Sequence, residues 1–301
     1  MDGERGGGMW TILDRGPGEP PWPGVPGGTV DGHLATIPAC AALGLRETSH
    51  HTGGIALAVD PQLPAVRARD GGVDPGAALM LADQATANGI FATLDRFVPM
   101  MTLGLRVDWA VPAPAVPLVC AIDDVMREGE LALVRGTLSA GGAIVGAATA
   151  RYLMGAMPGG FRDQPRTERA EPLSSAASFD DYLGAAAIDD GLCVTPTPAH
   201  VGARELPAFH GGVIAALIER TARNATGDGF RVLDVDVRYL APGRADRPLM
   251  TRAVPRRLGR RVATVDVAAY QDDPERPVAI GRVMAIADTP AALTAYRIGN
   301  R

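Results

Sequence analysis

Cysteine is scarce in this chain, and its absence from motifs excludes two kinds of structure. Only Cys40, Cys120 and Cys193 occur among 301 residues, and none stands in a Cys-x-x-Cys pair. A disulfide framework and a cysteine-based zinc site are therefore excluded. We expect reduced thiols in the core and neither a metal nor a cofactor.

The chain also lacks an excess of positive charge and any long apolar run. Lys and Arg number 29 against 34 Asp and Glu, a formal net charge of −5, which argues against a nucleic-acid binder. No apolar run approaches the ~18 residues that span a bilayer, and the first residues lack the basic-then-apolar pattern of a secretion signal. We expect a cytoplasmic enzyme or binding protein that acts on neither nucleic acid nor membrane.

Glycine and proline, by contrast, are abundant and mark the boundaries of two domains. Residues 1–32 are so rich in both that they cannot bury enough surface to order themselves, which indicates a flexible leader. A Pro-Gly-Gly triplet and a charged run mark residues 158–178 as a linker. The remaining chain forms two domains, residues 33–157 and 179–290, followed by a tail over residues 291–301.

The two domains carry the same pattern. Residues 74–83 read DPGAALMLAD and residues 210–219 read HGGVIAALIE. In each copy a turn containing glycine opens an apolar helix, and a carboxylate, Asp83 or Glu219, stands nine residues after the first position. Such a repeat predicts two units of one architecture.

The pattern continues into strands. Residues 103–109 and 235–239 alternate between apolar and polar, which is typical of a strand with one buried face. The helix over residues 77–91 is apolar nearly all round and is therefore expected to be buried against a sheet. A shorter helix is expected at the start of each unit, at residues 33–43 and 179–188. The sequence predicts an α+β fold in which a curved antiparallel sheet wraps one long helix.

These residues resemble the hotdog-fold acyl-CoA thioesterases of the phenylacetyl-CoA and 4-hydroxybenzoyl-CoA thioesterase type. The second copy carries a Leu-Gly pair, the His-Gly-Gly turn, Glu219, Tyr239 and the Gly259-Arg260 hairpin of that pattern. The first copy matches too, but it has Asp-Pro at residues 74–75 where the family has His-Gly. The resemblance covers about residues 34–155 and 179–287.

The resemblance implies a double hotdog, in which two antiparallel sheets each wrap a central helix and pair into one continuous sheet. Each active site of that family lies between two units, with the carboxylate from one and the His-Gly turn from the other. The implied substrate is an acyl-CoA, so coenzyme A belongs to the substrate and is not a cofactor. Association of two such double units into a homo-oligomer is a further expectation.

The first composite site would combine Asp83 with His210, Gly211 and Gly212. Backbone N–H groups at a helix N-terminus can hold the thioester oxygen as it becomes an oxyanion, and we assign this role to Gly211. Asp83 would act as a base that activates water or as a nucleophile. His210 and Gly212 would orient the substrate.

The second composite site would combine Glu219 with Asp74 and Pro75, and it is expected to be degenerate. Proline has no N–H to offer an oxyanion, and Asp74 places a negative charge where the oxyanion would form. Arg223 follows Glu219 by four residues, the spacing of a helical ion pair that would occupy the carboxylate.

Structural alternatives exist for several of these residues. Asp83 could be a buried polar residue satisfied by its neighbours, although a carboxylate in an apolar helix is costly without a purpose. His210 could be a turn residue only. Thr86 and Asn88 could orient water or substrate, or could be satisfied within the core.

Arg257 and Arg260 belong to the densest basic cluster, on the hairpin around Gly259. They are candidates for contacts to the phosphates of coenzyme A, because the guanidinium fork suits phosphate. A solvated hairpin turn is the alternative.

Three functions therefore remain. The first is an acyl-CoA thioesterase, and the second is a catalytically silent hotdog protein that binds acyl-CoA or serves assembly. The third, a hotdog hydratase or dehydratase, would need a His–carboxylate pair at the acyl β-carbon, and neither central helix contains a His. The sequence reveals neither the length or aromaticity of the acyl group nor whether a carrier protein replaces coenzyme A.

Overall fold

The computed structural model describes residues 29–51, 54–94, 98–113, 115–155, 175–203 and 207–287. Most of the predicted leader and linker, and the whole predicted tail, lie outside these residues. Helix α1 (Val30–Leu34) begins inside the stretch assigned to the leader, because Thr29 caps it by accepting a hydrogen bond from the Gly32 N–H.

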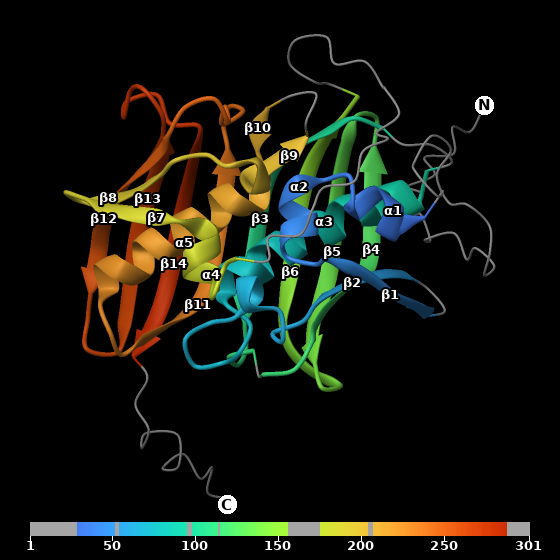
Figure 1. Cartoon of the computed structure of the whole chain (residues 1–301), viewed down its shortest axis with the longest axis horizontal. Coiled ribbons are helices and arrows are strands. Elements are labelled where there is room, and N and C mark those ends of the chain that lie inside the picture. The colour runs from blue at the N-terminus through green and yellow to red at the C-terminus, as the bar shows by residue number, and fades with distance from the viewer. Residues whose placement is uncertain are drawn as a thin grey trace, which may run out of the picture.

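One antiparallel sheet of twelve strands runs through the described chain (Figure 1). The first half contributes β1 (Arg46–His51), β2 (Gly54–Val59), β3 (Met100–Trp109), β4 (Leu118–Glu128), β5 (Leu131–Ala140) and β6 (Ala143–Met154). The second half contributes β7 (Ala185–Ile188), β8 (Gly191–Val194), β11 (Phe230–Tyr239), β12 (Leu249–Leu258), β13 (Val262–Tyr270) and β14 (Ala279–Ala287). Their order across the sheet is β1-β2-β4-β5-β6-β3-β11-β14-β13-β12-β8-β7.

The two halves meet where β3 pairs with β11. Leu105 lies opposite Val237 and Val107 lies opposite Val235, and all four side chains are fully buried. The alternation read in the sequence thus turns the apolar face of both strands toward the helices. The sheet is continuous across this pair.

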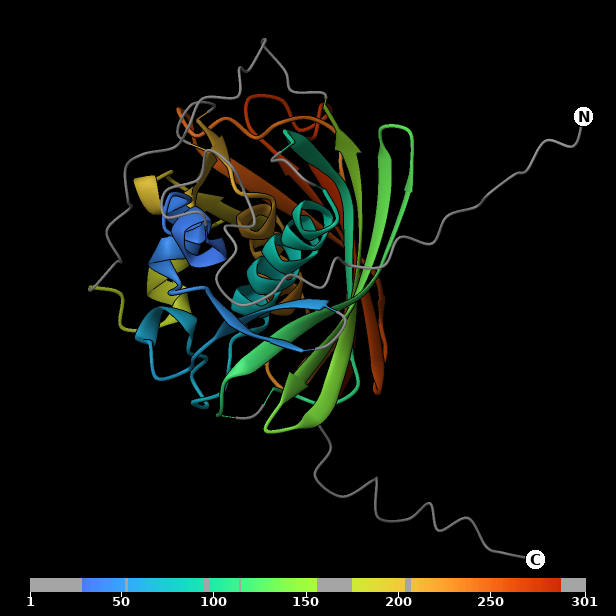
Figure 2. The same cartoon turned by 90° about the vertical axis from the view of Figure 1, so that its right-hand side faces the viewer.

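Two long helices, α3 (Pro75–Ala92) and α5 (Gly211–Thr226), pack against each other on one side of the sheet (Figure 2). The helix predicted over residues 77–91 is confirmed, with one or two further residues at its ends. The packing is close, since a Cβ on Gly212 would lie 2.5 Å from the Cα of Met80. None of the described helices is long and apolar enough to cross a membrane.

The remaining elements are short, and two of them correct the sequence analysis. The helix expected over residues 33–43 is split into α1 and α2 (Pro38–Ala42), because proline begins a helix but does not continue one. The helix expected over residues 179–188 ends after α4 (Phe179–Leu183), where Gly184 adopts a left-handed φ of 58° and β7 follows. The other elements of the described residues are the short segments η2 (Pro64–Val66), η3 (Pro198–His200), β9 (Val201–Ala203) and β10 (Ala208–Phe209).

Candidate active site

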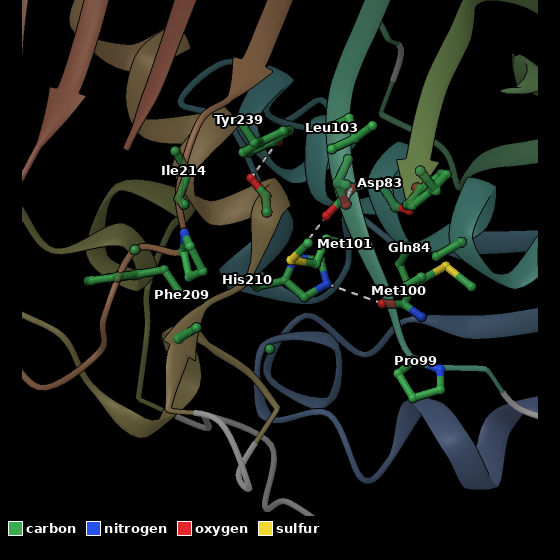
Figure 3. Close-up of a pocket in the computed structure, with 18 of the residues that line it drawn as sticks. Asp83, Gln84, Pro99, Met100, Met101, Leu103, Phe209, His210, Ile214 and Tyr239 are labelled. Atoms are coloured by element: carbon green, nitrogen blue, oxygen red, sulfur yellow. Dashed lines mark hydrogen bonds and ion pairs between the residues drawn. The ribbon is translucent and has the colours of Figure 1, made fainter. Parts of the chain in front are cut away.

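Asp83 lies in the middle of α3 and faces the N-terminus of α5 (Figure 3). Its Oδ2 accepts a hydrogen bond from the Gly212 N–H at 2.8 Å and lies 3.4 Å from Nδ1 of His210. A Cβ on Gly211 would lie 2.7 Å from the same oxygen. The structure therefore brings the carboxylate of one half against the His-Gly-Gly turn of the other.

Thr102, at the start of β3, is the second partner of Asp83. Its hydroxyl donates to Oδ1 at 3.1 Å, so both carboxylate oxygens are held. Burial raises the pKa of Asp83, while His210, Thr102 and the Gly212 N–H each lower it in part. The sequence analysis missed Thr102, although a lone hydroxyl at the start of an apolar strand was a signal that could have been read.

His210 is held in one tautomer by Gln84, the residue after Asp83. Gln84 donates from its Nε2 to Asn88 at 2.8 Å, which turns its Oε1 toward His210 Nε2, 3.1 Å away. Nε2 of His210 must then carry the proton, and Nδ1 accepts from the Gly212 N–H at 3.0 Å. Burial lowers the pKa of His210, against the opposing effect of Asp83, and so favours the neutral ring. His210 thus caps α5.

The Gly211 N–H has no acceptor among the described residues, although Gly211 lines the pocket described next. The carbonyl of Gly211 accepts from the Tyr239 hydroxyl at 2.8 Å, which fixes the orientation of the turn. A free N–H at a helix N-terminus is a donor for developing negative charge.

A pocket of about 350 Å³ opens beside Asp83 and is lined by both halves. Figure 3 shows Gln84 and Met100 on one side of His210, and Phe209 and Ile214 on the other. Most of its lining is apolar, with Asp83 and His210 among the few polar groups. This composition is typical of a site for a small molecule with one reactive polar group.

Three predicted substrate contacts are not brought to the pocket. Thr86 is fully buried and its hydroxyl bonds to the carbonyl of Ala82 at 2.7 Å and to Tyr152 at 2.7 Å. Asn88 is fully buried and accepts from Gln84. The Thr86 hydroxyl is thus satisfied within the core, because a helical hydroxyl bonds readily to the preceding turn. Nδ2 of Asn88 is also buried, and it has no hydrogen-bond partner among the described residues. Gly212 gives its N–H to Asp83 and His210 instead of to a substrate.

Arg257 and Arg260 lie on the exposed hairpin between β12 and β13, away from the pocket. In the sheet this hairpin is level with Phe230, the first residue of β11, whereas the pocket lies at Tyr239, the last. Ten residues of strand span about 30 Å. The structure brings neither arginine near Asp83.

The equivalent site around Glu219 is occupied by charged side chains of the chain itself. Asp74 caps α3 through the Gly76 N–H at 2.8 Å, and its other oxygen accepts from Arg220 at 2.9 Å. The ion pair expected between Glu219 and Arg223 is present, with Nε 3.2 Å from Oε1. Arg220, which also pairs with Asp180, was missed because its partners come from distant parts of the sequence.

Burial is complete at this second site. The Glu219 side chain has no exposed surface and that of Asp74 is 4% exposed. Burial, together with Asp74, raises the pKa of Glu219 to about 7, against the opposing effect of Arg223. The Phe179 ring packs directly against the first turn of α3, since a Cβ on Gly76 would lie 2.3 Å from that ring. A substrate has no access to these carboxylates in this arrangement.

One family model and several solved structures are similar to this chain. Residues 203–286 match the family model of the acyl-CoA thioesterase N-terminal domain. The resemblance to hotdog-fold acyl-CoA thioesterases is confirmed. The match begins at β9 and ends in β14, and it includes the His-Gly-Gly turn and α5. A search of curated protein sequences gave no match.

Several solved structures share the fold. The tesB protein of Mycobacterium avium subs paratuberculosis has a TM-score of 0.54 at 14% identity and covers 86% of this chain and 99% of its own. Acyl-CoA thioesterase II TesB2 of Mycobacterium marinum has 0.51 at 12%, covering 84% and 97%. A conserved protein with a hot dog fold from Alicyclobacillus acidocaldarius has 0.54 at 14%, covering 83% and 97%. At these identities the likeness establishes the fold, and the family match supports a thioester hydrolase.

Proposed function

We propose that the chain is a double hotdog, one unit per half, that hydrolyses acyl-CoA thioesters at the composite site of Asp83. The observation that carries this proposal is the hydrogen bond from the Gly212 N–H of α5 to the Asp83 carboxylate of α3. It sets a carboxylate from one half beside the free N–H of Gly211 from the other, at the wall of an apolar pocket. Hydrolysis of a thioester uses both groups, the carboxylate as base or nucleophile and the N–H as oxyanion donor.

In this mechanism the thioester oxygen takes the hydrogen bond of the Gly211 N–H. The positive end of the α5 dipole favours the negative charge that forms on that oxygen. Asp83 removes a proton from water as the water oxygen bonds to the carbonyl carbon. The carbon–sulfur bond then breaks, and the thiolate of coenzyme A takes the proton, so that Asp83 returns to its starting state.

Asp83 can also attack the carbonyl carbon itself. An anhydride between Asp83 and the acyl group then forms as coenzyme A leaves, and water hydrolyses it. Both routes use only groups of the chain and water, with coenzyme A as part of the substrate. They also need the same unprotonated carboxylate, which Thr102 and Gly212 hold in place.

The site around Glu219 is inactive in this proposal. Pro75 occupies the position of Gly211 and offers no N–H, and Arg220 and Arg223 occupy the carboxylates that would otherwise act. One double unit would therefore carry one working site. Arg257 and Arg260 have no part in this proposal, because the hairpin between β12 and β13 lies at the end of the sheet opposite the pocket.

A hotdog hydratase or dehydratase, the third function that the sequence left open, is the alternative on which the 3.4 Å between His210 and Asp83 bears. Hydration needs a ring nitrogen that can pass a proton to or from the substrate. Both nitrogens of His210 already have partners within the protein, Gly212 on one side and Gln84 on the other. The geometry therefore favours hydrolysis.

Incubation of the purified chain with saturated and with 2-enoyl acyl-CoAs tests the choice. Thiol release is followed with a thiol reagent, and hydration of the enoyl double bond by its ultraviolet absorbance. We expect thiol release from both kinds of substrate and no loss of the double bond. Hydration without thiol release would refute the proposal, and tight binding without either reaction would indicate the silent acyl-CoA-binding protein.

A further inference from the structure

The pocket beside Asp83 has an exposed end and a buried end. At the exposed end Leu240 is 56% exposed and is followed by exposed Ala241 and Pro242. At the other end His33 and Phe91 are 2% and 3% exposed. Coenzyme A is large and highly charged and must stay in water, so only the acyl group can enter the buried end.

The buried end runs along one face of α3. Gln84, Ala87 and Phe91 line it at spacings of three and four residues, which places them on one stripe of the helix. Ile37 of the segment before α2 and Met100 of β3 form the facing walls. Apart from Gln84, which is turned toward His210, these side chains are apolar.

The stripe ends in a closed contact. The rings of Phe91 and His33 meet edge to face with centroids 5.5 Å apart, and Phe91 is nearly fully buried. Ala87, halfway along, is the smallest side chain of the stripe and leaves the space open. We call this buried part of the pocket the branch. It begins at Asp83, is open at Ala87 and ends at Phe91.

The length of this branch follows from the helix. Eight residues separate Asp83 from Phe91, which is about 12 Å at a rise of about 1.5 Å per residue. An extended alkyl chain advances about 1.25 Å per carbon, given carbon–carbon bonds of about 1.5 Å. The branch thus holds about ten carbons. The whole pocket, about 350 Å³, lies near the lower limit for ligand pockets.

We propose that the acyl group lies along α3 from Asp83 to Phe91, that Ala87 and Phe91 determine its length, and that the substrates are unbranched acyl thioesters of about eight to ten carbons. This inference rests on the proposed function. A benzoyl or phenylacetyl group would fill only the part of the branch near Gln84 and would leave the apolar surface around Phe91 uncovered.

Hydrolysis of a saturated series from butanoyl-CoA to hexadecanoyl-CoA, with phenylacetyl-CoA alongside, tests the length. We expect kcat/KM to rise about fourfold per methylene while each methylene enters apolar surroundings, to reach a maximum at octanoyl- or decanoyl-CoA, and then to fall. A profile that still rises at hexadecanoyl-CoA, or a preference for phenylacetyl-CoA, would overturn the proposal.

Three variants test the position of the chain. Ala87→Phe blocks the middle of the branch and should move the maximum to butanoyl- or hexanoyl-CoA. Phe91→Ala opens the end and should move it to longer chains. Ala87→Ser adds a single oxygen and is the control, with the same maximum as the unaltered chain. Thermal unfolding of each variant shows whether it is folded, and Ala87→Phe alone decides the matter if Phe91→Ala does not fold. An unchanged maximum in folded Ala87→Phe would contradict the assignment.

Binding of non-hydrolysable S-alkyl-CoA thioethers separates this inference from the proposed function. If no acyl-CoA is hydrolysed, but thioether affinity peaks at octyl or decyl chains and Ala87→Phe shortens that peak, the branch is correct and the hydrolase is wrong. If hydrolysis occurs and neither the rate profile nor the thioether affinity responds to Ala87→Phe, the hydrolase stands and the branch is wrong.

Discussion

The Asp83 carboxylate accepts a hydrogen bond from the Gly212 N–H, 129 residues further along the chain, at 2.8 Å. The bond joins the middle of α3 to the first turn of α5, and so it joins the two halves of the chain at the site itself. The proposed composite site depends on this contact. Each variant below alters a group beside Asp83 or in the charged cluster around Glu219.

Thr102→Val removes the hydrogen bond to Oδ1 of Asp83 while keeping the shape of the side chain. The base form of Asp83 must be unprotonated, so activity rises with pH through the Asp83 pKa, which burial has raised above its usual range. Because the Thr102 hydroxyl lowers that pKa, its loss should move the acid limb of the kcat/KM profile to higher pH. We also expect kcat to fall by about tenfold or more, the scale of one hydrogen bond to a charged group. An acid limb that stays in place would show that Asp83 is not the titrating group.

Gly211→Pro should lower kcat by about a hundredfold or more relative to Gly211→Ala, the scale of one lost oxyanion donor. Both variants add a Cβ that would lie 2.7 Å from the Asp83 carboxylate, but only proline also deletes the N–H. Proline is tolerated at the first position of a helix, and Pro75 occupies this position in α3. Equal kcat values for the two variants would exclude the Gly211 N–H as the oxyanion donor.

Asp74→Ala should destabilise the fold but spare the reaction. The variant removes the cap of α3 and one carboxylate from the buried cluster with Arg220 and Arg223. We expect the free energy of unfolding to fall by about 2–4 kcal/mol. This is less than the sum of a lost cap and a broken buried ion pair, because Arg220 keeps Asp180 and Arg223 keeps Glu219 as partners. Denaturant unfolding measures this loss. At a temperature where the variant is folded, thiol release should stay within about fivefold of the unaltered chain, the scale of ~1 kcal/mol in a barrier.

Glu219 should make the fold less stable as the pH rises from about 4.5 to about 7. Its pKa is about 7 in the folded chain, above the ordinary value of 4.5, so between these values the folded state binds more protons than the unfolded state. Stability therefore falls with rising pH across this window and is level above it. His210, whose folded pKa is lowered, acts in the opposite sense. The difference between the unfolding curves of the unaltered chain and Glu219→Gln isolates Glu219, and a difference that does not vary with pH would contradict the raised pKa.

The sequence alone predicted the helices and strands whose apolar residues recur at a regular spacing over neighbouring positions. The buried helix over residues 77–91 and the alternating strands of residues 103–109 and 235–239 were read from their periodicity, because burial imposes that periodicity on neighbouring residues. The helix expected over residues 179–188 is present only as far as Leu183, since the left-handed Gly184 ends it and the remaining residues pair as β7.

The composition of the site was only partly predictable. Asp83, His210 and Gly211 could be placed together because the resemblance to hotdog-fold thioesterases implies a carboxylate from one unit beside the His-Gly turn of the other. Gln84 and Arg220 were missed, because each acts on a partner more than a hundred residues away that no spacing reveals. Thr86 was assigned to the substrate from its proximity to Asp83, but its hydroxyl bonds within the core.

Thiol release measured side by side for Asp83→Asn and Glu219→Gln tests the central claim most directly. Asparagine keeps the size of Asp83 but cannot act as a base, so we expect a loss of at least ~100-fold in kcat while an S-alkyl-CoA thioether still binds. Glu219→Gln should leave kcat nearly unchanged, because the carboxylate is buried and paired with Arg223. Loss of activity in Glu219→Gln, with full activity in Asp83→Asn, would contradict the account by placing catalysis at the site that carries Pro75.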